Sequence, residues 1–399
     1  MNRKISILTA TTLFPNLAQP SHGVFVETRL RHLLASGEVA AHVLAPVPWL
    51  PPFVRYSSYG PLRDVPSRIV RNGLTIEHPR YLVVPKFGMT LTPSTLYRAM
   101  RRRLAALWKQ GHRFDLIDAH YFYPDGVAAV WLAQEFGLPI TVTARGTDLN
   151  LIPEFPEPRR MILDAAAKAD GLITVCQALK DTLVEMGVAG NRVKVLRNGV
   201  DLELFRPIDR AAARRSLGLT RRTLASVGLL IERKGHHHII RALNDLPDTD
   251  LVIAGDGPDR RALERLAEEF GVKDRVRFLG SVDQNRLREV YNAADALVLA
   301  SSREGWANVL LEAMACGTPV VASAVWGTPE VVTCPEAGVL MSSLDPQGVV
   351  EGVRKLFAAY PDHNATRRYA EGFDWRSTTQ GQIDLFHAII ESRKARARR

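Results

Sequence analysis

Two glutamates, Glu304 and Glu312, lie eight positions apart in the stretch 304–321, which reads EGWANVLLEAMACGTPVV. Glu304 follows the apolar run 296–300 in a glycine-containing loop, and Glu312 lies inside the helical pattern that comes next. The first N–H groups of a helix have no intrahelical acceptor, so this helix start is predicted to bind a phosphate. The amides concerned belong to Trp306, Ala307, Asn308 and Val309, with Asn308 as the candidate cap. Glu312 can accept two ribose hydroxyls and Glu304 can contact a second sugar, which together predict a nucleotide-sugar site.

A second set of charged groups follows another apolar run. Lys234 ends the loop after the run 224–228, directly before a glycine that opens the next helix. A fixed cation at this point stabilises the negative charge that builds on a departing diphosphate. Arg233 is the candidate for a second cation there, and the alternative for both residues is a solvated surface pair.

The first half of the chain has polar residues in comparable places. His120 follows an apolar run and could polarise a hydroxyl, although a hydrogen-bonded lid over the core is the alternative. Gly23 lies in the first strand-to-helix connection, where the missing Cβ lets backbone approach a diphosphate; a plain turn glycine is the alternative. Arg145 and Asp148 follow the run 140–144. Arg145 is expected to bind an anionic acceptor or the donor phosphate and Asp148 to orient it, with a local structural ion pair as the alternative.

Short apolar runs of the strand type alternate with amphipathic helical runs along the whole chain, which indicates parallel sheets covered on both faces. The expected strands are 5–10, 42–45, 116–119, 140–144, 171–175 and 193–196, then 224–228, 251–254, 276–279, 296–299, 319–322 and 338–341. Ligands of such sheets bind beyond the carboxyl ends of the strands, where the residues above are placed. Two Rossmann-like domains are therefore predicted.

Motifs along nearly the whole chain carry a family resemblance. They are HGVFVE (22–27), DLIDAHYFYPDG (115–126), TARGTDLN (143–150), RNGVDLELF (197–205), VGLLIERKG (227–235), IAGDGP (253–258), AADALVLASSREG (293–305), the stretch from Glu304 to Val321, and WGTPEVV (326–332). In order and spacing they resemble the retaining glycosyltransferases of family 4. The resemblance implies the α/β GT-B fold, in which two Rossmann-like α/β/α domains with parallel sheets face an interdomain cleft. An acceptor-binding domain is expected over 1–205 and a nucleotide-sugar-binding domain over 206–375, with the last helix, 376–393, packing back on the first domain.

The resemblance also assigns roles to individual residues. It implies that Glu304 contacts the donor sugar, that Glu312 grips the ribose, and that His120 lines the sugar or acceptor side. The nucleotide base is expected against the loop that contains Gly280 and Val282. The family usually has arginine where this chain has Leu229, a departure that leaves Arg233 to supply that charge.

Two patterns that imitate metal sites are set aside. Residues 248–250 read DTD, but they precede a strand in a polar turn. The three consecutive histidines at 236–238 point in different directions on a helix and cannot converge on one ion. We therefore expect no cofactor and no required metal ion.

Composition bounds the class of protein. With 399 residues and 46% hydrophobic content the chain can bury two cores, and its three separated cysteines favour a reducing compartment over a zinc site. The N-terminal residues imitate a signal peptide, but we expect the run 5–10 to be a buried strand. No apolar segment approaches the roughly 18 residues that cross a bilayer, so a cytoplasmic protein is expected.

The net charge of +10 gathers in the segment 97–113 and in the C-terminal tail. Beside the first lies the stretch 46–62, whose Trp49, Leu50, Phe53, Tyr56 and Tyr59 could meet a lipid interface. An anionic membrane surface, at the inner face of the cytoplasmic membrane, is thus a candidate partner. A solvated helix face beside a proline-stiffened loop is the alternative.

The function predicted is the transfer of a sugar, with retention, from a nucleoside-diphosphate sugar to a hydroxyl of a lipid-linked glycan in cell-envelope or exopolysaccharide biosynthesis. A nucleotide-sugar epimerase on the same fold is the first alternative, because it would turn over the donor without an acceptor. A non-enzymatic protein that binds anionic surfaces or nucleic acid is the second. No nucleic-acid motif is present, so nucleic acid is not expected as a partner.

Overall fold

The computed structural model of the protein describes residues 3–49, 57–83 and 88–397, and it divides into two compact units. Unit 1 contains Met1–Arg197 together with Arg376–Arg399, and unit 2 contains Asn198–Trp375. The boundary precedes the expected one at 205/206, because the segment 198–205 is bonded to unit 2. The N–H of Val200 donates to the carbonyl of Phe373 at 2.9 Å, and Arg367 donates to the carbonyl of Phe205 at 2.7 Å.

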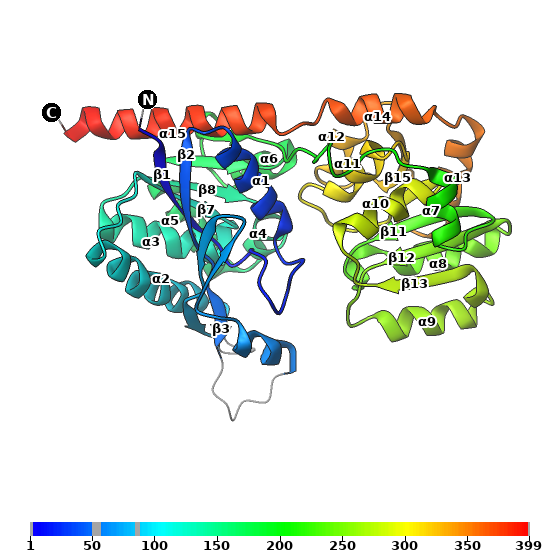
Figure 1. Cartoon of the computed structure of the whole chain (residues 1–399), viewed down its shortest axis with the longest axis horizontal. Helices are drawn as coiled ribbons and strands as arrows, with labels where there is room; N and C mark the ends of the chain where they lie inside the picture. Colours follow the sequence, from blue (N-terminus) through cyan, green and yellow to red (C-terminus); the bar gives the residue numbers. More distant parts are fainter. Residues whose placement is uncertain (1–2, 50–56, 84–87, 398–399) are drawn as a thin grey trace. The chain divides into compact units, whose positions relative to one another are not determined.

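Unit 1 is built on an eight-stranded sheet in the order β10-β9-β8-β7-β1-β2-β5-β4 (Figure 1). Its strands are β1 (Ile5–Ala10), β2 (Val39–Leu44), β4 (Arg68–Arg71), β5 (Leu74–Glu77), β7 (Leu116–His120), β8 (Ile140–Ala144), β9 (Gly171–Thr174) and β10 (Val193–Val195). Neighbouring strands are parallel except β4 and β5, which form an antiparallel hairpin. The short strands β3 (Val47–Trp49) and β6 (Arg80–Leu82) form a separate parallel pair.

Helices cover both faces of this sheet. They are α1 (Val24–Ala35), α2 (Thr92–Lys109), α3 (Val127–Phe136), α4 (Thr147–Asn150), α5 (Pro156–Lys168), α6 (Gln177–Glu185) and α15 (Arg376–Ala397). The C-terminal helix α15 packs against α1, and its Ile383, Phe386 and Ile389 join the same buried cluster as Ile5 and Ile7 of β1. The last helix is thus part of the core of unit 1, far from its neighbours in sequence.

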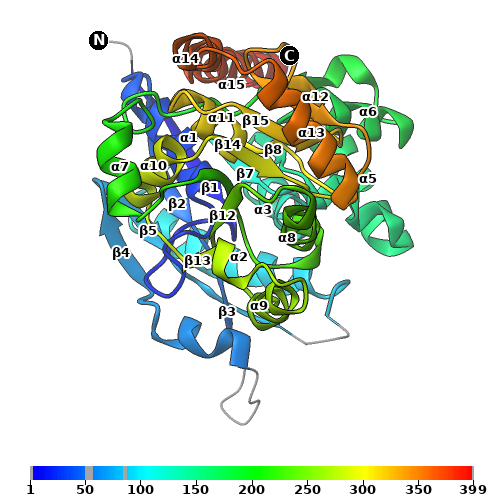
Figure 2. The ribbon, with the colours of Figure 1, turned by 90° about the vertical axis from the view of Figure 1, so that its right-hand side faces the viewer.

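Unit 2 contains a fully parallel six-stranded sheet in the order β13-β12-β11-β14-β15-β16. Its strands are β11 (Arg222–Val227), β12 (Thr249–Ala254), β13 (Val276–Gly280), β14 (Ala296–Leu299), β15 (Val320–Ser323) and β16 (Gly338–Met341). Its helices are α7 (Arg210–Ser216), α8 (His236–Ala242), α9 (Arg260–Glu269), α10 (Gln284–Ala293), α11 (Asn308–Ala315), α12 (Thr328–Val331), α13 (Pro346–Ala358) and α14 (His363–Glu371) (Figure 2). Across the described residues of both units, no helix has the length and apolar character needed to span a bilayer.

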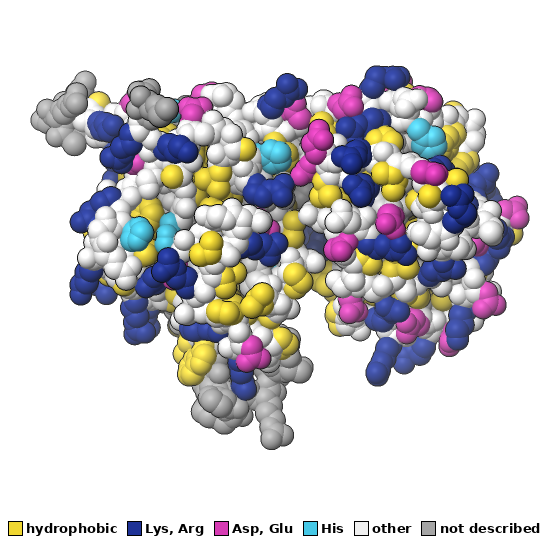
Figure 3. Space-filling view, viewed as in Figure 1, with side chains coloured by type: hydrophobic (Ala, Val, Ile, Leu, Met, Phe, Trp, Pro, Cys, Tyr) yellow, Lys and Arg dark blue, Asp and Glu magenta, His cyan; other side chains and the backbone are white. Residues whose placement is uncertain are grey.

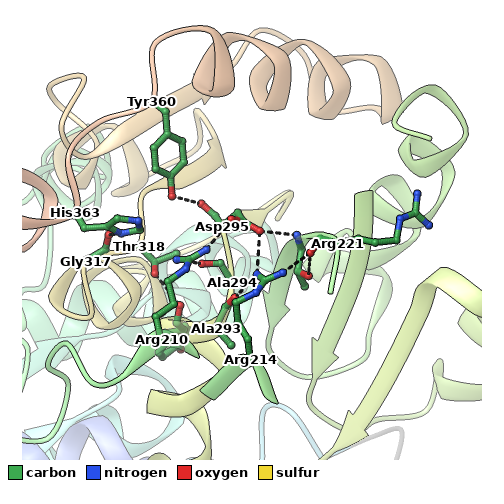
Figure 4. A network of polar contacts seen from close by, with 12 residues as sticks. Arg210, Arg214, Arg221, Ala293, Ala294, Asp295, Gly317, Thr318, Tyr360 and His363 are labelled. Carbon is green, nitrogen blue, oxygen red and sulfur yellow. Dashed lines mark hydrogen bonds and ion pairs between the residues drawn. The ribbon is translucent and has the colours of Figure 1, made fainter. Parts of the chain in front are cut away.

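Asp295 ties the amino-terminal ends of the central strands of unit 2 together (Figure 4). Its carboxylate accepts from the N–H of Thr223 at the start of β11 at 2.7 Å and forms ion pairs with Arg210 at 2.6 Å and Arg214 at 3.3 Å. Its carbonyl accepts from the hydroxyl of Tyr360 at 2.7 Å. This network fixes β11 and β14 to α7, and both strands lead at their other ends into the predicted donor loops.

Candidate active site

Glycines let three backbone segments pack directly against one another at the carboxyl edge of the sheet of unit 2. Gly228 and Gly255, after β11 and β12, have φ values of 153° and 149°, and a Cβ on Gly255 would lie 1.8 Å from the carbonyl oxygen of Gly228. Gly235, with φ 69°, opens α8, and a Cβ there would lie 1.8 Å from the carbonyl oxygen of Ala300 after β14. Larger residues would force these loops apart.

Lys234 and Glu304 meet at this edge. Their Nζ and Oε1 atoms are 2.7 Å apart, and both side chains are largely buried, with exposed fractions of 17% and 8%. The two residues predicted to serve the donor are therefore brought together, although they are 70 positions apart in the sequence. The partly desolvated ammonium group of Lys234 is held by the carboxylate of Glu304, an arrangement in which an incoming anion can share the cation.

Arg233 links the two loops that carry this pair. Its guanidinium donates to the carbonyl of Arg303 at 2.7 Å, and its own carbonyl accepts from the N–H of Ser302 at 2.9 Å. These bonds hold the Glu304 loop beside Lys234. Leu229, in the place where an arginine was expected from the family pattern, has an exposed fraction of 54%.

The helix after Glu304 has its cap one residue earlier than expected. Asn308 is the first residue of α11 and not its cap; the preceding Ala307 takes the cap position and no side chain caps the helix. The side-chain oxygen of Asn308 instead accepts from the amide of Asn198 at 3.2 Å. Within the described residues, the N–H groups of Ala307 and Val309 have no hydrogen-bond acceptor. Trp306, 6% exposed, lies 6.2 Å from the ring of Phe373.

Glu312 lies on the side of α11 that faces α10. Its Oε2 accepts from the hydroxyl of Tyr291 at 2.8 Å, and burial raises the pKa of its carboxyl to about 7. Burial and the nearby Glu312 raise the pKa of the Cys316 thiol to about 12, so this cysteine stays protonated. Gly280 and Val282 lie at the end of β13 and in the loop before α10, at the same edge of the sheet.

In unit 1, the glycine at position 23 is explained by the protein's own backbone. Gly23 has φ 69° and precedes α1, and a Cβ there would lie 2.2 Å from the carbonyl carbon of Leu13. The conformation and the packing both require glycine, whether or not a ligand approaches it.

His120 ends β7 as a buried group, 1% exposed, with both ring nitrogens engaged. Its Nε2 lies 3.2 Å from Oδ2 of Asp118, and its Nδ1 lies 2.7 Å from Nη2 of Arg145. Burial lowers the pKa of His120 to about 4, against the opposing effect of Asp118. The ring is therefore neutral near pH 7.

Asp148 organises a loop. Its carboxylate, fully buried, accepts from the N–H groups of Phe122 at 2.6 Å, Gly146 at 2.6 Å and Arg145 at 3.0 Å. These bonds give Asp148 a structural role in the loop, and its role in orienting a ligand stays a prediction. The guanidinium of Arg145, only 8% exposed, lies 5.6 Å from the ring centroid of Phe25 in α1.

The two patterns that imitate metal sites have other partners. Asp248 and Asp250 lie near Arg221, with closest N–O distances of 3.9 and 3.3 Å. His236 Nδ1 lies 2.9 Å from the hydroxyl of Ser226. Within the described residues no group of three potential metal ligands comes together.

Four residues bonded to the predicted site residues, or to one another beside them, were not predicted from the sequence: Asp118, Arg29, Gln382 and Tyr291. Asp118 had a usable signal, since it lies two positions before His120 and strand residues two apart share a face. Tyr291 and Gln382 had none, because their partners lie on other elements far along the chain.

Comparisons with known proteins agree with this architecture. A family described as glycosyl transferases group 1 matches residues 209–373, and one described as glycosyltransferase family 4 matches residues 24–204. D-inositol 3-phosphate glycosyltransferase of Saccharomonospora viridis is 33% identical over 318 residues, covering 72% of this chain and 73% of that protein. Its counterpart in Mycobacteroides abscessus is 31% identical over 426 aligned positions, covering 98% and 91%.

Solved structures share the fold at lower identity. Sucrose-phosphate synthase from Thermosynechococcus elongatus superposes with a TM-score of 0.79 at 22% identity, covering 98% of this chain and 100% of that one. Anabaena HepE, solved in complex with UDP and glucose, has a TM-score of 0.73 at 19% identity, with 96% and 100% covered. Both confirm the two-domain arrangement of parallel sheets known as GT-B. The chain therefore belongs to glycosyltransferase family 4 and is an enzyme that transfers sugars.

Proposed function

We propose that this protein moves a sugar from a nucleoside-diphosphate sugar to a hydroxyl of a glycan, with retention of the anomeric configuration. The observation that carries the proposal is the Lys234–Glu304 pair, held at the carboxyl edge of the sheet of unit 2 by a glycine-dependent packing of loops. The unoccupied N–H groups of Ala307 and Val309 at the start of α11 add donors for phosphate oxygens.

In this mechanism the acceptor hydroxyl attacks the anomeric carbon on the face from which the diphosphate leaves. The bond from that carbon to the phosphate oxygen breaks as the new glycosidic bond forms, and the hydroxyl proton passes to the departing oxygen. Lys234 and the helix amides take up the charge on the diphosphate, which is the part of the reaction where fixed donors lower the barrier most. Protein groups supply this charge, so the proposal requires no metal ion.

The rest of the donor is held by neighbouring groups of unit 2. Glu304 contacts the transferred sugar once the ammonium group turns to the diphosphate. Glu312 accepts ribose hydroxyls, and the loop with Gly280 and Val282 holds the base. UDP is the nucleotide to test first, because HepE was solved with UDP and glucose.

The test is a panel of nucleotide sugars incubated with the enzyme, with and without acceptors, and analysed for nucleotide release and for glycoside product. Transfer with retained configuration is expected for one donor and one acceptor of the panel. D-inositol 3-phosphate belongs among the acceptors because relatives carry that name. Consumption of a donor to an epimer without acceptor, or no consumption of any donor, contradicts the proposal.

We place the acceptor of this reaction on a lipid-linked glycan of the cell envelope, reached at an anionic membrane. Support comes from exposed hydrophobic side chains on unit 1, namely Trp49 and Leu82, which face each other in the β3–β6 pair, and Met89 and Leu91 just before α2. The exposed Arg98 and Arg102 lie on α2. Figure 3 shows hydrophobic side chains among Lys and Arg over this part of unit 1. Leu50, Phe53 and Tyr56 lie outside the described residues.

Co-sedimentation with anionic vesicles tests the membrane contact. Binding at low salt should fall when Arg98 and Arg102 are replaced by alanine, because each basic residue near an anionic surface contributes about 1 kcal/mol. Replacing Arg261 and Arg265, two exposed arginines of α9, is the matched control and should leave binding unchanged. Equal vesicle binding by both double variants would show that α2 does not contact the membrane.

A further inference from the structure

A continuous chain of buried polar side chains runs through unit 1 from its C-terminal helix to the loop after β8. Arg29 of α1 donates through Nε to Oε1 of Gln382 in α15 at 2.9 Å, and Nε2 of Gln382 donates to Oδ2 of Asp118 at 2.9 Å. The same Oδ2 lies 3.2 Å from Nε2 of His120, whose Nδ1 lies 2.7 Å from Nη2 of Arg145. Arg29, Asp118, His120 and Gln382 are each at most 2% exposed.

The chemistry of the end groups fixes the direction of every bond in this chain. A guanidinium can only donate, so Nδ1 of His120 must accept from Arg145 and Nε2 must carry the ring proton. An ionised carboxylate can only accept hydrogen bonds, and Oδ2 of Asp118 accepts one from Nε2–H of His120 and one from the Gln382 amide. Arg29 likewise orients the amide of Gln382, with its oxygen toward the guanidinium.

The charged groups that face His120 keep this arrangement in one state. Burial lowers the pKa of the ring, Asp118 of β7 raises it, and Arg145 and Arg29 lower it again, with a resulting value of about 4. A second ring proton would have to sit on Nδ1, where it would oppose a donor of Arg145. Although burial opposes its charge, Asp118 has a lowered pKa because of His120, Thr141 and Arg29, so it remains ionised.

We infer that Gln382 and Asp118 are positioning residues that lock His120 as a neutral ring protonated on Nε2, so that His120 serves as a fixed hydrogen-bond acceptor for Arg145 and takes no proton during transfer. Of these two groups, Arg145 and not the ring is then the one that would meet an acceptor, since Arg145 is 8% exposed and His120 1%. The inference rests on the proposed function only for this last consequence, since the state of the ring can be measured without substrate. It also agrees with a mechanism in which the departing phosphate takes the proton.

Nuclear magnetic resonance of the full-length protein with ¹⁵N-labelled histidine tests the lock. The signal of His120 is identified among the 11 histidines by its loss in His120→Gln. Nε2 should carry the proton and Nδ1 should not, and neither should titrate between pH 8 and pH 5. A proton on Nδ1, or a titration near the ordinary histidine pKa, overturns the inference.

Two substitutions separate the parts of the chain. Arg145→Met removes a cation that lowers the pKa, so the His120 ring should begin to titrate at higher pH than in the wild type. Gln382→Met keeps the packing of α15 but removes the bond to Asp118, and exchange of the Nε2 proton with water should accelerate about 10-fold. Gln380→Met makes the same change on an exposed face of α15 and should alter neither signal.

If the Nε2 proton exchanges in Gln382→Met at the wild-type rate, the role of Gln382 is refuted. If the His120 ring in Arg145→Met titrates no differently from the wild type, the role of Arg145 is refuted. UDP binding, which tests unit 2, should be equal in all of these variants. If the wild type does not bind UDP, that result contradicts the proposed donor site and leaves the measured state of His120 unaffected.

Discussion

The ammonium group of Lys234 and the carboxylate of Glu304 form an ion pair that a bound diphosphate must rearrange. The pair is largely buried, so water screens it weakly and each partner interacts strongly with a third charge. A diphosphate brings more negative charge than one carboxylate, and the cation is expected to turn toward it. Glu304 is then released to hydrogen-bond with the sugar.

Lys234→Ala should lower turnover by about 100-fold or more, because it removes the fixed charge that stabilises the leaving group. Steady-state kinetics with the donor identified by the panel gives the value. Lys273→Ala removes an exposed lysine of the same unit, paired with Glu268 at 2.5 Å, and should leave turnover unchanged. Equal turnover in Lys234→Ala and wild type would refute the assigned role.

The raised pKa of Glu312 predicts that nucleotide binding depends on pH. Its pKa is raised to about 7, so the ionised carboxylate that accepts ribose hydroxyls is lost as the pH falls through 7. UDP affinity, measured by calorimetry, should weaken about 10-fold from pH 8 to pH 6, following the ionised fraction. Glu312→Gln should bind more weakly and with a flat profile over this range. A wild-type affinity that does not change with pH contradicts the assignment.

At the scale of elements, the buried strands were the predictable part of the fold. Runs rich in apolar and β-branched residues predicted β1, β8, β14 and β16 with the observed bounds, because strands covered on both faces carry few strongly polar side chains. The β4–β5 hairpin was missed although Asn72 and Gly73, with φ values of 51° and 77°, mark its turn. Strand β4 reads RIVR, with exposed and half-buried residues in alternation, so it lacked the long apolar run that marks a buried strand.

The same contrast holds for the site. The position of Lys234 and Glu304 at the carboxyl edge of the sheet could be predicted because each lies in a loop that follows a buried strand, whereas their roles stay predictions. The Arg29–Gln382 bond could not, because it joins residues 353 positions apart that meet only once α1 and α15 have packed together. Asn308 was misassigned as a cap because helix ends shift by a residue with the geometry of the preceding loop.

The Asp295 network predicts a stability effect at this scale. Asp295→Ala leaves the N–H of Thr223 and two arginines without their shared acceptor and should cost about 2 to 3 kcal/mol. The midpoint of thermal unfolding should then fall by roughly 4 to 12 °C. Asp248→Ala removes a carboxylate that is 95% exposed and should change the midpoint little. Equal midpoints in the two variants would show that the network does not stabilise unit 2.

The whole molecule consists of one unit formed by both ends of the chain and one formed by its middle. Helix α15 contributes Ile383, Phe386 and Ile389 to the core of unit 1. Burial of a large apolar side chain contributes about 1.5 to 3 kcal/mol, so removal of these three side chains should destabilise unit 1 substantially.

Deletion of residues 376–399 should therefore destabilise unit 1 while unit 2 keeps its fold. Limited proteolysis followed by mass spectrometry should find early cleavage within 3–197, and UDP binding should persist. Deletion from Lys394 onward is the control, because Arg393, which lies 3.4 Å from Asp170, remains. If unit 1 resists protease as well after deletion of residues 376–399 as it does in the wild type, α15 is dispensable for its stability.

The distribution of unit 1 over both ends of the chain also orders the events of biosynthesis. The ribosome delivers every residue of unit 2 before it delivers α15, and domains generally fold as units during synthesis. Unit 2 can thus fold while residues 1–197 still expose the apolar surface that α15 covers in the folded protein.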